Sequence, residues 1–228
     1  MEKRLLQLYR LLPTAGKGII DVGTDHGQIP VRLAQDGYPG AIYASDIHPG
    51  PLDIARKAAA RAGVSKRISF LLCDGLDGCP PDQIDCILIA GMGGDTICGI
   101  LDRAEWLFST QYHLVLQPMT RPEVLRYWLI HNGFTIDQER TVSEDHRIYQ
   151  LFSASPGNSQ PYRDVEYLIG KPGYGREKGS FRILLTEQQR LLTKKLSGLR
   201  ESGMESSPSY CFYQKILEDI NASCSQLD

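Results

Sequence analysis

Residues 20–27 have the sequence IDVGTDHG, in which an apolar run ends and a turn with two glycines begins. A strand, a glycine-containing turn and then a helix form the first unit of many open α/β sheets that bind nucleotide-like ligands. This turn also contains two ionisable residues, Asp25 and His26, at a place where such turns are usually uncharged. The stretch therefore predicts an α/β fold and a ligand site of unusual charge.

Beyond this turn, short apolar runs alternate with longer stretches whose apolar residues recur at helical spacing. Such alternation is typical of βαβ units on a parallel sheet. It predicts strands at residues 17–23, 41–46, 68–74, 85–91 and 113–118, and helices near residues 28–37, 50–63, 94–107 and 121–132. Residues 134–155 predict two extended runs that fold back on each other, which makes the last strand antiparallel in a mostly parallel sheet.

A change of composition divides the chain near residue 160. Residues 156–180 are rich in Pro, Gly and Ser, a composition that disfavours regular structure and marks a connection. We therefore expect one domain over residues 1–160 and a helical appendage over residues 161–228. On either side of residues 201–209, apolar residues at helical spacing predict two amphipathic helices in an antiparallel coiled-coil hairpin. These residues are Leu185, Leu192, Leu196 and Leu199, then Tyr210, Tyr213, Ile216, Leu217 and Ile220.

Composition excludes several classes of protein. The chain has 228 residues, 42% of them hydrophobic, and a formal net charge of −2, values typical of an ordinary globular chain. It contains no apolar run long enough to cross a membrane and no signal-peptide core, so we expect a cytoplasmic protein without membrane contact. Its six cysteines form no CxxC pair, so we expect reduced packing residues and no metal site. We expect a monomer rather than an obligate oligomer.

Ligands of open α/β sheets bind at the carboxyl ends of the strands, where four turns of this chain present notable residues. These are Asp21, Gly23, Thr24, Asp25, His26 and Gly27 after the first strand, Asp46 and Ile47 after the second, Asp74 and Gly75 after the third, and AGMGG (90–94) after the fourth. Asp46 follows Gly23 at the spacing at which a carboxylate accepts hydrogen bonds from both hydroxyls of a bound ribose. That spacing suits NAD or S-adenosylmethionine.

Charge separates these two cofactors. A pyrophosphate needs bare backbone N–H groups, and the carboxylate of Asp25 would repel it. S-adenosylmethionine has no phosphate and has cationic groups, so an acid-lined turn favours it over NAD. Asp74 and Gly75 would then face the adenine amine, and Ala90 and Gly91 the methionine end. Each residue also has an ordinary structural explanation, since Asp46 can cap a helix, His26 can brace its turn and Asp74 can stabilise an Asp-Gly turn.

Several motifs together resemble those of the bacterial tRNA (adenine-N1)-methyltransferases that modify an adenine in the D-loop region of tRNA. They are IIDVGTDHGQIPVRLA, SDIHPGPLDIA, CDGL, DCILIAGMGG, VLQP and ERTVSEDHRIYQLF, in order over residues 4–155. The resemblance implies a Rossmann-like class I methyltransferase fold, S-adenosylmethionine as cofactor, adenine N1 as methyl acceptor and a C-terminal coiled-coil domain. The family shares an aspartate at the position of Asp25, where a generic GxGxG motif has its middle glycine.

Methyl transfer to adenine N1 needs alignment more than a strong base, because N1 has its own lone pair. Attack by the exocyclic N6 commonly uses an Asp/Asn-Pro-Pro-aromatic tetrapeptide after the fourth strand, and this chain has AGMG there. Methylation of N1 makes the base cationic, so a nearby carboxylate can stabilise the developing charge. Asp25 is the first candidate for this catalytic role and His26 the second.

Contact with tRNA is predicted at two places. Met92, Gln117 and Pro118 are candidates for the base pocket. Residues 163–200 contain nine Lys or Arg and four acids, a local excess of +5 that can follow phosphates or belong to a solvated helix face. The candidates there are Arg176, Lys178, Arg182, Lys194 and Lys195. Arg121 and Arg126 could reach phosphate or be ordinary surface charges.

Two other functions remain open from the residues alone. One is a methyltransferase of the same fold that acts on another RNA or a small molecule, because fold does not determine substrate. The other is a noncatalytic RNA-binding or interaction module, which predicts no cofactor affinity. A nicotinamide oxidoreductase is disfavoured by the charge of the first turn.

Overall fold

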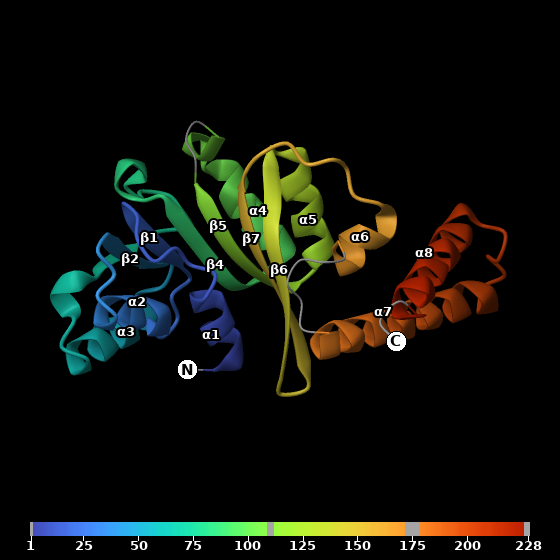
Figure 1. The fold of residues 1–228 in the computed structure, drawn as a ribbon, viewed down its shortest axis with the longest axis horizontal. Coiled ribbons are helices and arrows are strands. Elements are labelled where there is room, and N and C mark those ends of the chain that lie inside the picture. The colour runs from blue at the N-terminus through green and yellow to red at the C-terminus, as the bar shows by residue number, and fades with distance from the viewer. Residues whose placement is uncertain (1, 109–111, 172–177, 226–228) are drawn as a thin grey trace.

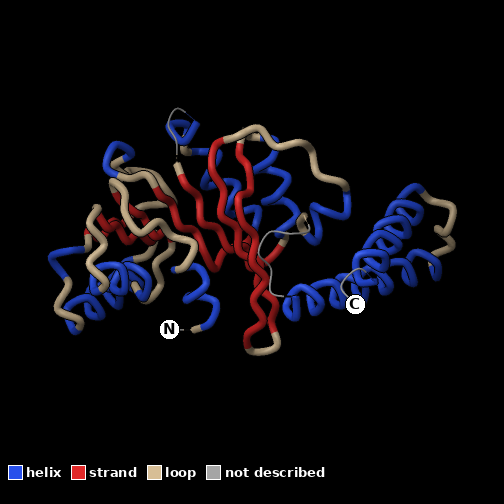
Figure 2. The backbone as a smooth tube through the Cα atoms, in the orientation of Figure 1, coloured by secondary structure: helices blue, strands red, loops and turns tan. Residues whose placement is uncertain are grey.

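A seven-stranded sheet organises the chain (Figures 1 and 2). The structure, a computed structural model, describes residues 2–108, 112–171 and 178–225. The strand order is β3-β2-β1-β4-β5-β7-β6. The strands are β1 (Gly18–Val22), β2 (Ala41–Asp46), β3 (Ser69–Leu72), β4 (Cys86–Gly93), β5 (His113–Thr120), β6 (Phe134–Glu144) and β7 (Arg147–Pro156).

The direction of the strands agrees with the predicted fold class. Strands β1 to β5 pair in parallel, and β7 is antiparallel to both β5 and β6. The order turns back between β1 and β4, so the carboxyl ends of these two strands flank the point at which an open sheet binds its ligand. The Rossmann-like sheet with one antiparallel strand is thereby confirmed.

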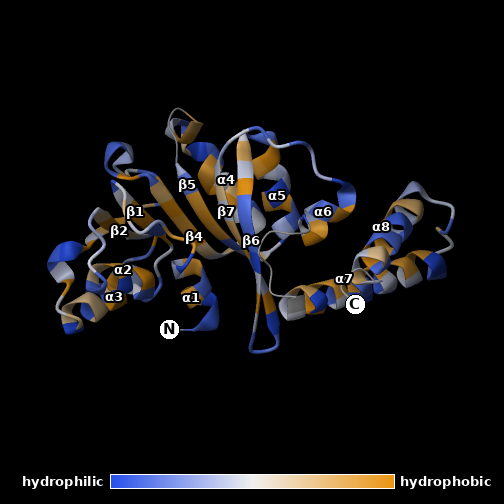
Figure 3. Ribbon diagram, viewed as in Figure 1, coloured by the Kyte–Doolittle hydropathy of each residue, from blue (hydrophilic) through white to orange (hydrophobic). Residues whose placement is uncertain are grey.

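Helices cover both faces of the sheet because its central strands are apolar on both sides. Helices α1 (Lys3–Tyr9), α2 (Gln28–Gln35) and α3 (Pro49–Arg61) contribute Leu8, Leu33 and Ala59 to one core. Helices α4 (Gly94–Arg103) and α5 (Pro122–His131) contribute Leu101 and Leu129 to the core on the other face. Figure 3 shows the apolar residues along the strands between these layers. Single 3-10 turns lie at Ser65–Arg67, Pro81–Gln83 and Glu105–Phe108.

A helical hairpin extends away from the sheet, as Figure 1 shows. It consists of α7 (Lys178–Glu201) and α8 (Pro208–Ser225). A separate small core joins the two helices to α6 (Asp164–Ile169), and it contains Val165, Ile169, Phe181, Leu184, Leu185, Leu192, Ile216 and Ile220. The predicted helical hairpin is therefore present, and the division of the chain at residue 160 stays a prediction.

Two helices were not expected from the sequence. Helix α1 has only seven residues, and α6 lies inside the stretch whose composition disfavours regular structure. The side chain of Glu166 accepts the backbone N–H of Arg163 at 2.9 Å, so this cap starts α6 despite its surroundings. Short helices of this kind depend on caps and packing more than on periodicity.

The expectation for Arg126 was wrong. Its side chain is fully buried, and its guanidinium donates two hydrogen bonds to the carboxylate of Glu139 at 3.2 and 3.0 Å. It also donates to the carbonyl oxygens of Tyr167 and Leu168 and to the side chain of Gln150. Arg126 is therefore an internal link between α5, the last strands and α6. It is neither a phosphate ligand nor a surface charge.

All six cysteines are free thiols, and Cys79, Cys86 and Cys98 are buried. Within residues 2–108, 112–171 and 178–225, none of the helices combines the length and the apolar character needed to span a bilayer.

Candidate functional site

A cleft of about 540 Å³ opens at the carboxyl ends of β1, β2 and β4. It brings together most of the candidate residues from the strand ends: Asp21, Gly23, Thr24, Asp25, His26, Gly27, Asp46, Ala90, Gly91 and Met92. The wall is completed by residues that the sequence did not suggest, namely Glu2, Arg4, Leu5, Gln28, Ile29, His48 and Pro51.

The first turn is held close to its neighbours by backbone contacts. The N–H groups of Gly23 and Thr24 donate to the carbonyl oxygen of Ser45 at 2.8 and 3.0 Å. Gly23 has φ +75°, and a Cβ there would lie 2.3 Å from the terminal methyl of Met92. Only glycine suits this position, since it accepts the left-handed conformation and leaves room for the methionine.

A buried carboxylate forms the floor of the cleft. Asp21 accepts a hydrogen bond from the hydroxyl of Thr24 at 2.6 Å. The pKa of Asp21 is raised to about 6. Burial is the main cause; the hydrogen bond from Thr24 opposes the shift, and the charge of Asp46 adds to it. A carboxylate in this environment gains by facing a cation, because a positive charge offsets its lost hydration.

Asp46 ends β2 at the side of the cleft. Its Oδ1 atom accepts the backbone N–H of His48 at 2.9 Å, which fixes the direction of the carboxylate. His48 is the residue that precedes α3, so Asp46 braces the approach to this helix without capping it. This position agrees with that expected for a carboxylate that binds ribose hydroxyls.

Asp25 and His26 lie at the open rim of the cleft. Their side chains are 74% and 55% exposed, and Asp25 Oδ2 lies 3.4 Å from His26 Nε2. Both residues can therefore contact a second molecule that approaches the cleft from outside.

Helix α1 closes the remaining side of the cleft. Its Arg4 donates a hydrogen bond from Nη1 to Gln117 Oε1 at 2.7 Å, and its guanidinium lies 5.3 Å from the ring centre of Tyr149. The only sequence signal for this helix is an apolar pattern interrupted by polar residues. Such a pattern does not show against which part of the sheet a short helix packs.

The structure does not bring three of the predicted cofactor residues to the wall of this cleft. Ile47 is 54% exposed, and Asp74 pairs with Arg103 across 3.0 Å. Gly75 is buried, and a Cβ added to it would lie 2.9 Å from the side chain of Ile100. The pairing of Asp74 with a cation from α4 could not be anticipated, because the spacing of the two residues in the sequence has no regular pattern.

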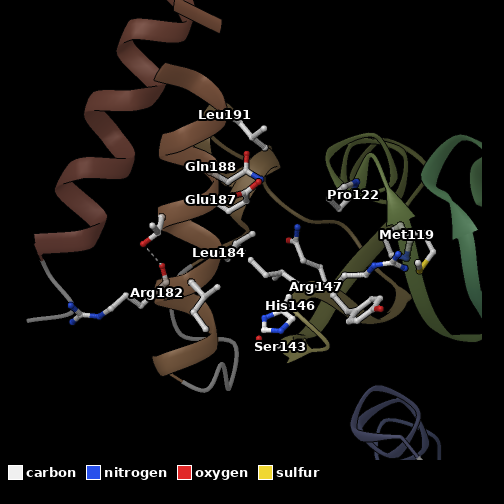
Figure 4. A pocket seen from close by; sticks show the side chains of 16 residues that line it. Met119, Pro122, Ser143, His146, Arg147, Arg182, Leu184, Glu187, Gln188 and Leu191 are labelled. Atoms are coloured by element: carbon white, nitrogen blue, oxygen red, sulfur yellow. Dashed lines mark hydrogen bonds between the residues drawn. The ribbon is translucent and has the colours of Figure 1, made fainter. Parts of the chain in front are cut away.

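A second cleft, of about 880 Å³, lies between the end of β5, the β6–β7 hairpin and α7. Figure 4 shows Arg147 extending toward Met119, while Arg182 points to the opposite side. Pro118 lines this cleft and Met92 lines the first one. Gln117, also a candidate for the base pocket, is fully buried and lines neither cleft; it donates to the carbonyl oxygen of Pro118 at 2.9 Å and accepts from Arg4.

The basic residues of the appendage have varied surroundings. Ion pairs at 2.6 to 3.1 Å neutralise Arg163, Arg190 and Arg200. Lys194 is exposed, and the ammonium of Lys195 lies 4.0 Å from the ring centre of Tyr213. Arg176 lies outside the described residues, and only the backbone of Lys178 is described. Tyr213 and Lys195 also line a third cleft, of about 450 Å³, between α5, α6 and the hairpin.

Comparison with known proteins places this geometry among methyltransferases. The sequence model of the family described as "Methyltransferase domain" matches residues 1–152. The tRNA (adenine(22)-N(1))-methyltransferase of Bacillus subtilis is 29% identical over 73% of this chain and 68% of its own. A Streptococcus agalactiae protein of the NADB-Rossmann superfamily has a TM-score of 0.83, with 28% identity over 98% of this chain and 97% of the other.

A third comparison extends the likeness of fold to the hairpin. M. capricolum TrmK, solved with S-adenosyl-homocysteine, has a TM-score of 0.83 and 24% identity, and the match covers 100% of this chain and 99% of that one. The family match spans more than half of the sequence and includes every strand end that forms the first cleft. This chain therefore belongs to the methyltransferase-domain family.

Proposed function

We propose that the protein is an S-adenosylmethionine-dependent methyltransferase that methylates N1 of an adenine in the D-loop region of tRNA. The observation on which this rests is the acid-lined cleft at the ends of β1, β2 and β4 in a chain of the methyltransferase family. The likeness to the tRNA (adenine(22)-N(1))-methyltransferase of Bacillus subtilis supports the choice of acceptor.

The lining of the cleft fits this cofactor. Asp21, Asp25 and Asp46 present carboxylates to a ligand that has a sulfonium, an ammonium and ribose hydroxyls. Asp46 would bind the ribose, and the backbone at Ala90 and Gly91 would lie beside the methionine end. When bound, the cofactor supplies an electrophilic methyl group and a good leaving group.

The protein's contribution to the reaction is alignment and charge stabilisation. Asp25 and His26 stand at the rim, where a nucleobase that has left its stack would approach. As N1 is methylated, the base becomes cationic, and the carboxylate of Asp25, exposed at the rim, would stabilise that charge. Met92 lines the cleft beside these residues and can pack on the base.

The hairpin and the second cleft are proposed to hold the rest of the tRNA. The exposed Lys194, together with Arg182, Lys195 and the undescribed Arg176, would contact phosphates. Lys178 begins α7, a helix that contacts β6 and β7, and is proposed to belong to the same phosphate-binding surface.

Methyl transfer to unmodified tRNA tests this function. The protein is incubated with methyl-labelled S-adenosylmethionine and unmodified bulk tRNA, and the modified nucleoside is identified by mass spectrometry. We expect N1-methyladenosine, which is lost in Asp46→Ala. A matched control is Asp53→Ala, an exposed carboxylate on α3 that pairs with Arg56 outside the cleft. Methylation of another nucleoside, or cofactor binding without transfer to tRNA, would contradict the proposed acceptor.

A further inference from the structure

We propose that Arg4 binds the α-carboxylate of the amino-acid part of S-adenosylmethionine and so makes the cleft selective for a carboxylated cofactor. This inference rests on the proposed function, because it concerns the same cleft. It assigns a role to helix α1, which none of the sequence motifs includes.

The balance of charge in the cleft favours a carboxylate-binding role for Arg4. Four acids line it: Glu2, Asp21, Asp25 and Asp46. Among the described residues of its wall, Arg4 is the only lysine or arginine. These acids suit the cationic groups of the cofactor and repel its carboxylate, so the carboxylate needs a cation of its own.

The position of Arg4 across the sheet also suits this role. Its hydrogen bond to Gln117 places the guanidinium over β5, and Gln117 pairs in register with Ala90 at the end of β4. Asp46 ends β2, and β1 and β4 lie between β2 and β5. Neighbouring strands are about 4.8 Å apart, so the strand that carries Asp46 and the strand that carries Gln117, the partner of Arg4, lie roughly 14 Å apart. An extended ligand with its ribose at Asp46 then directs its amino-acid end toward Arg4.

The guanidinium is held in place before any ligand binds. Gln117 accepts one of its N–H groups, the ring of Tyr149 lies under it, and its side chain is only 19% exposed. The backbone N–H groups of Lys3 and Arg4 donate to the carboxylate of Glu144 at 2.5 and 3.3 Å, which ties the start of α1 to the β6–β7 hairpin. A guanidinium has five N–H donors, so donors remain for a bidentate carboxylate.

The internal ion pair of Arg4 is weak enough to be replaced. Glu2 Oε2 lies 3.7 Å from Arg4 Nη2, and the side chain of Glu2 is 60% exposed. A pair of this length, with one partner mostly in solvent, contributes little to stability. A ligand carboxylate with two short hydrogen bonds would displace it.

Direct binding measurements test this role without any turnover. The dissociation constants of S-adenosylmethionine, S-adenosylhomocysteine and decarboxylated S-adenosylmethionine are measured by calorimetry for the wild-type protein, Arg4→Met and Arg4→Lys. Methionine preserves the packing of the side-chain stem, and lysine preserves the charge without the planar fork. Arg10→Met is the matched control, because Arg10 is an exposed residue at the end of the same helix and does not line the cleft.

We expect Arg4→Met to weaken binding of the two carboxylated ligands about ten- to hundredfold. Binding of the decarboxylated ligand should change less than threefold, and Arg4→Lys should lie between wild type and Arg4→Met. Equal losses for all three ligands would show a merely structural role and overturn the proposal. Unchanged affinity for S-adenosylmethionine would also overturn it, including the case in which only tRNA binding weakens. A wild-type protein that binds none of the ligands would instead contradict the proposed function.

Discussion

Two regions of this molecule contain clustered charges, but only one of them balances acids with a cation. In the first cleft, Asp21, Asp25 and Asp46 face an opening that contains one arginine among its described lining residues. Beneath α5, the buried charges of Arg126 and Glu139 satisfy each other through two hydrogen bonds. The difference teaches that charge alone does not mark function. Carboxylates that gather in a cleft with a single arginine are candidates for binding a cationic ligand, whereas matched buried charges hold elements together.

The largest effect is expected from a substitution that breaks the ion pair between Arg126 and Glu139. Arg126→Met removes the two hydrogen bonds that Arg126 donates to the buried carboxylate of Glu139, so we expect the free energy of unfolding to fall by about 3–5 kcal/mol. Urea titration followed by circular dichroism measures this change. The double variant Arg126→Met with Glu139→Leu should recover most of the loss. If the double variant is as unstable as the single one, the pair is not the source of the effect.

The next substitution is expected to increase the free energy of unfolding. Asp21 is a buried acid whose pKa is raised to about 6. An acid with a raised pKa in the folded state destabilises the protein as pH rises through the interval between its unfolded value, about 4, and its folded value. Asp21→Asn should therefore stabilise the protein by up to about 3 kcal/mol above pH 6, and the gain should disappear near pH 4. Urea titrations from pH 4.5 to 8 measure it. A gain that does not depend on pH would contradict this origin.

The third prediction concerns ligand affinity rather than stability. Asp46→Ala removes the carboxylate expected to accept two ribose hydroxyls, so S-adenosylmethionine should bind roughly a hundredfold more weakly. The midpoint of unfolding should change little, since the carboxylate is partly exposed and its bond to His48 is local. Calorimetry and a thermal melt of the same sample compare the two quantities. Equal affinity in Asp46→Ala would place the ribose elsewhere.

The smallest effect is expected from substitutions at the rim of the cleft, which should slow methyl transfer and leave cofactor affinity almost unchanged. Asp25→Asn preserves shape at an exposed position and removes the charge, so we expect single-turnover methyl transfer to slow about tenfold. Affinity for S-adenosylmethionine should stay within threefold of wild type. His26→Asn is the companion variant and should slow transfer less. Lost affinity in Asp25→Asn would instead make Asp25 a cofactor residue.

The strands, the hairpin and the meeting of the strand ends at one cleft could be predicted from the sequence. The alternation of apolar runs and helical stretches predicted β1 to β7 and the hairpin, because each pattern reflects burial on a sheet or in a helix pair. The turn with Asp25 and the end of β2 with Asp46 were predicted to meet, and both line one cleft. Parallel strands bring their ends to the same edge whatever the intervening helices contain.

The sequence could not reveal partners chosen by tertiary packing. Asp74 pairs with Arg103 from α4, Arg126 is buried beside Glu139, and Arg4 reaches the cleft from a seven-residue helix. None of these contacts has a repeating interval along the chain. The assignment of individual residues to cofactor or tRNA stays a prediction that the variants above can test.

The contact between Gly23 and Met92 has a consequence for oxidation. The methyl of Met92 occupies the space beside Gly23, and the side chain also lines the cleft. Conversion of its thioether to a sulfoxide would add a polar oxygen to a side chain packed against the first turn. We therefore expect peroxide treatment to lower the ligand-binding fraction of the protein, and methionine sulfoxide reductases to restore it. In Met92→Leu, the binding fraction should resist the same treatment.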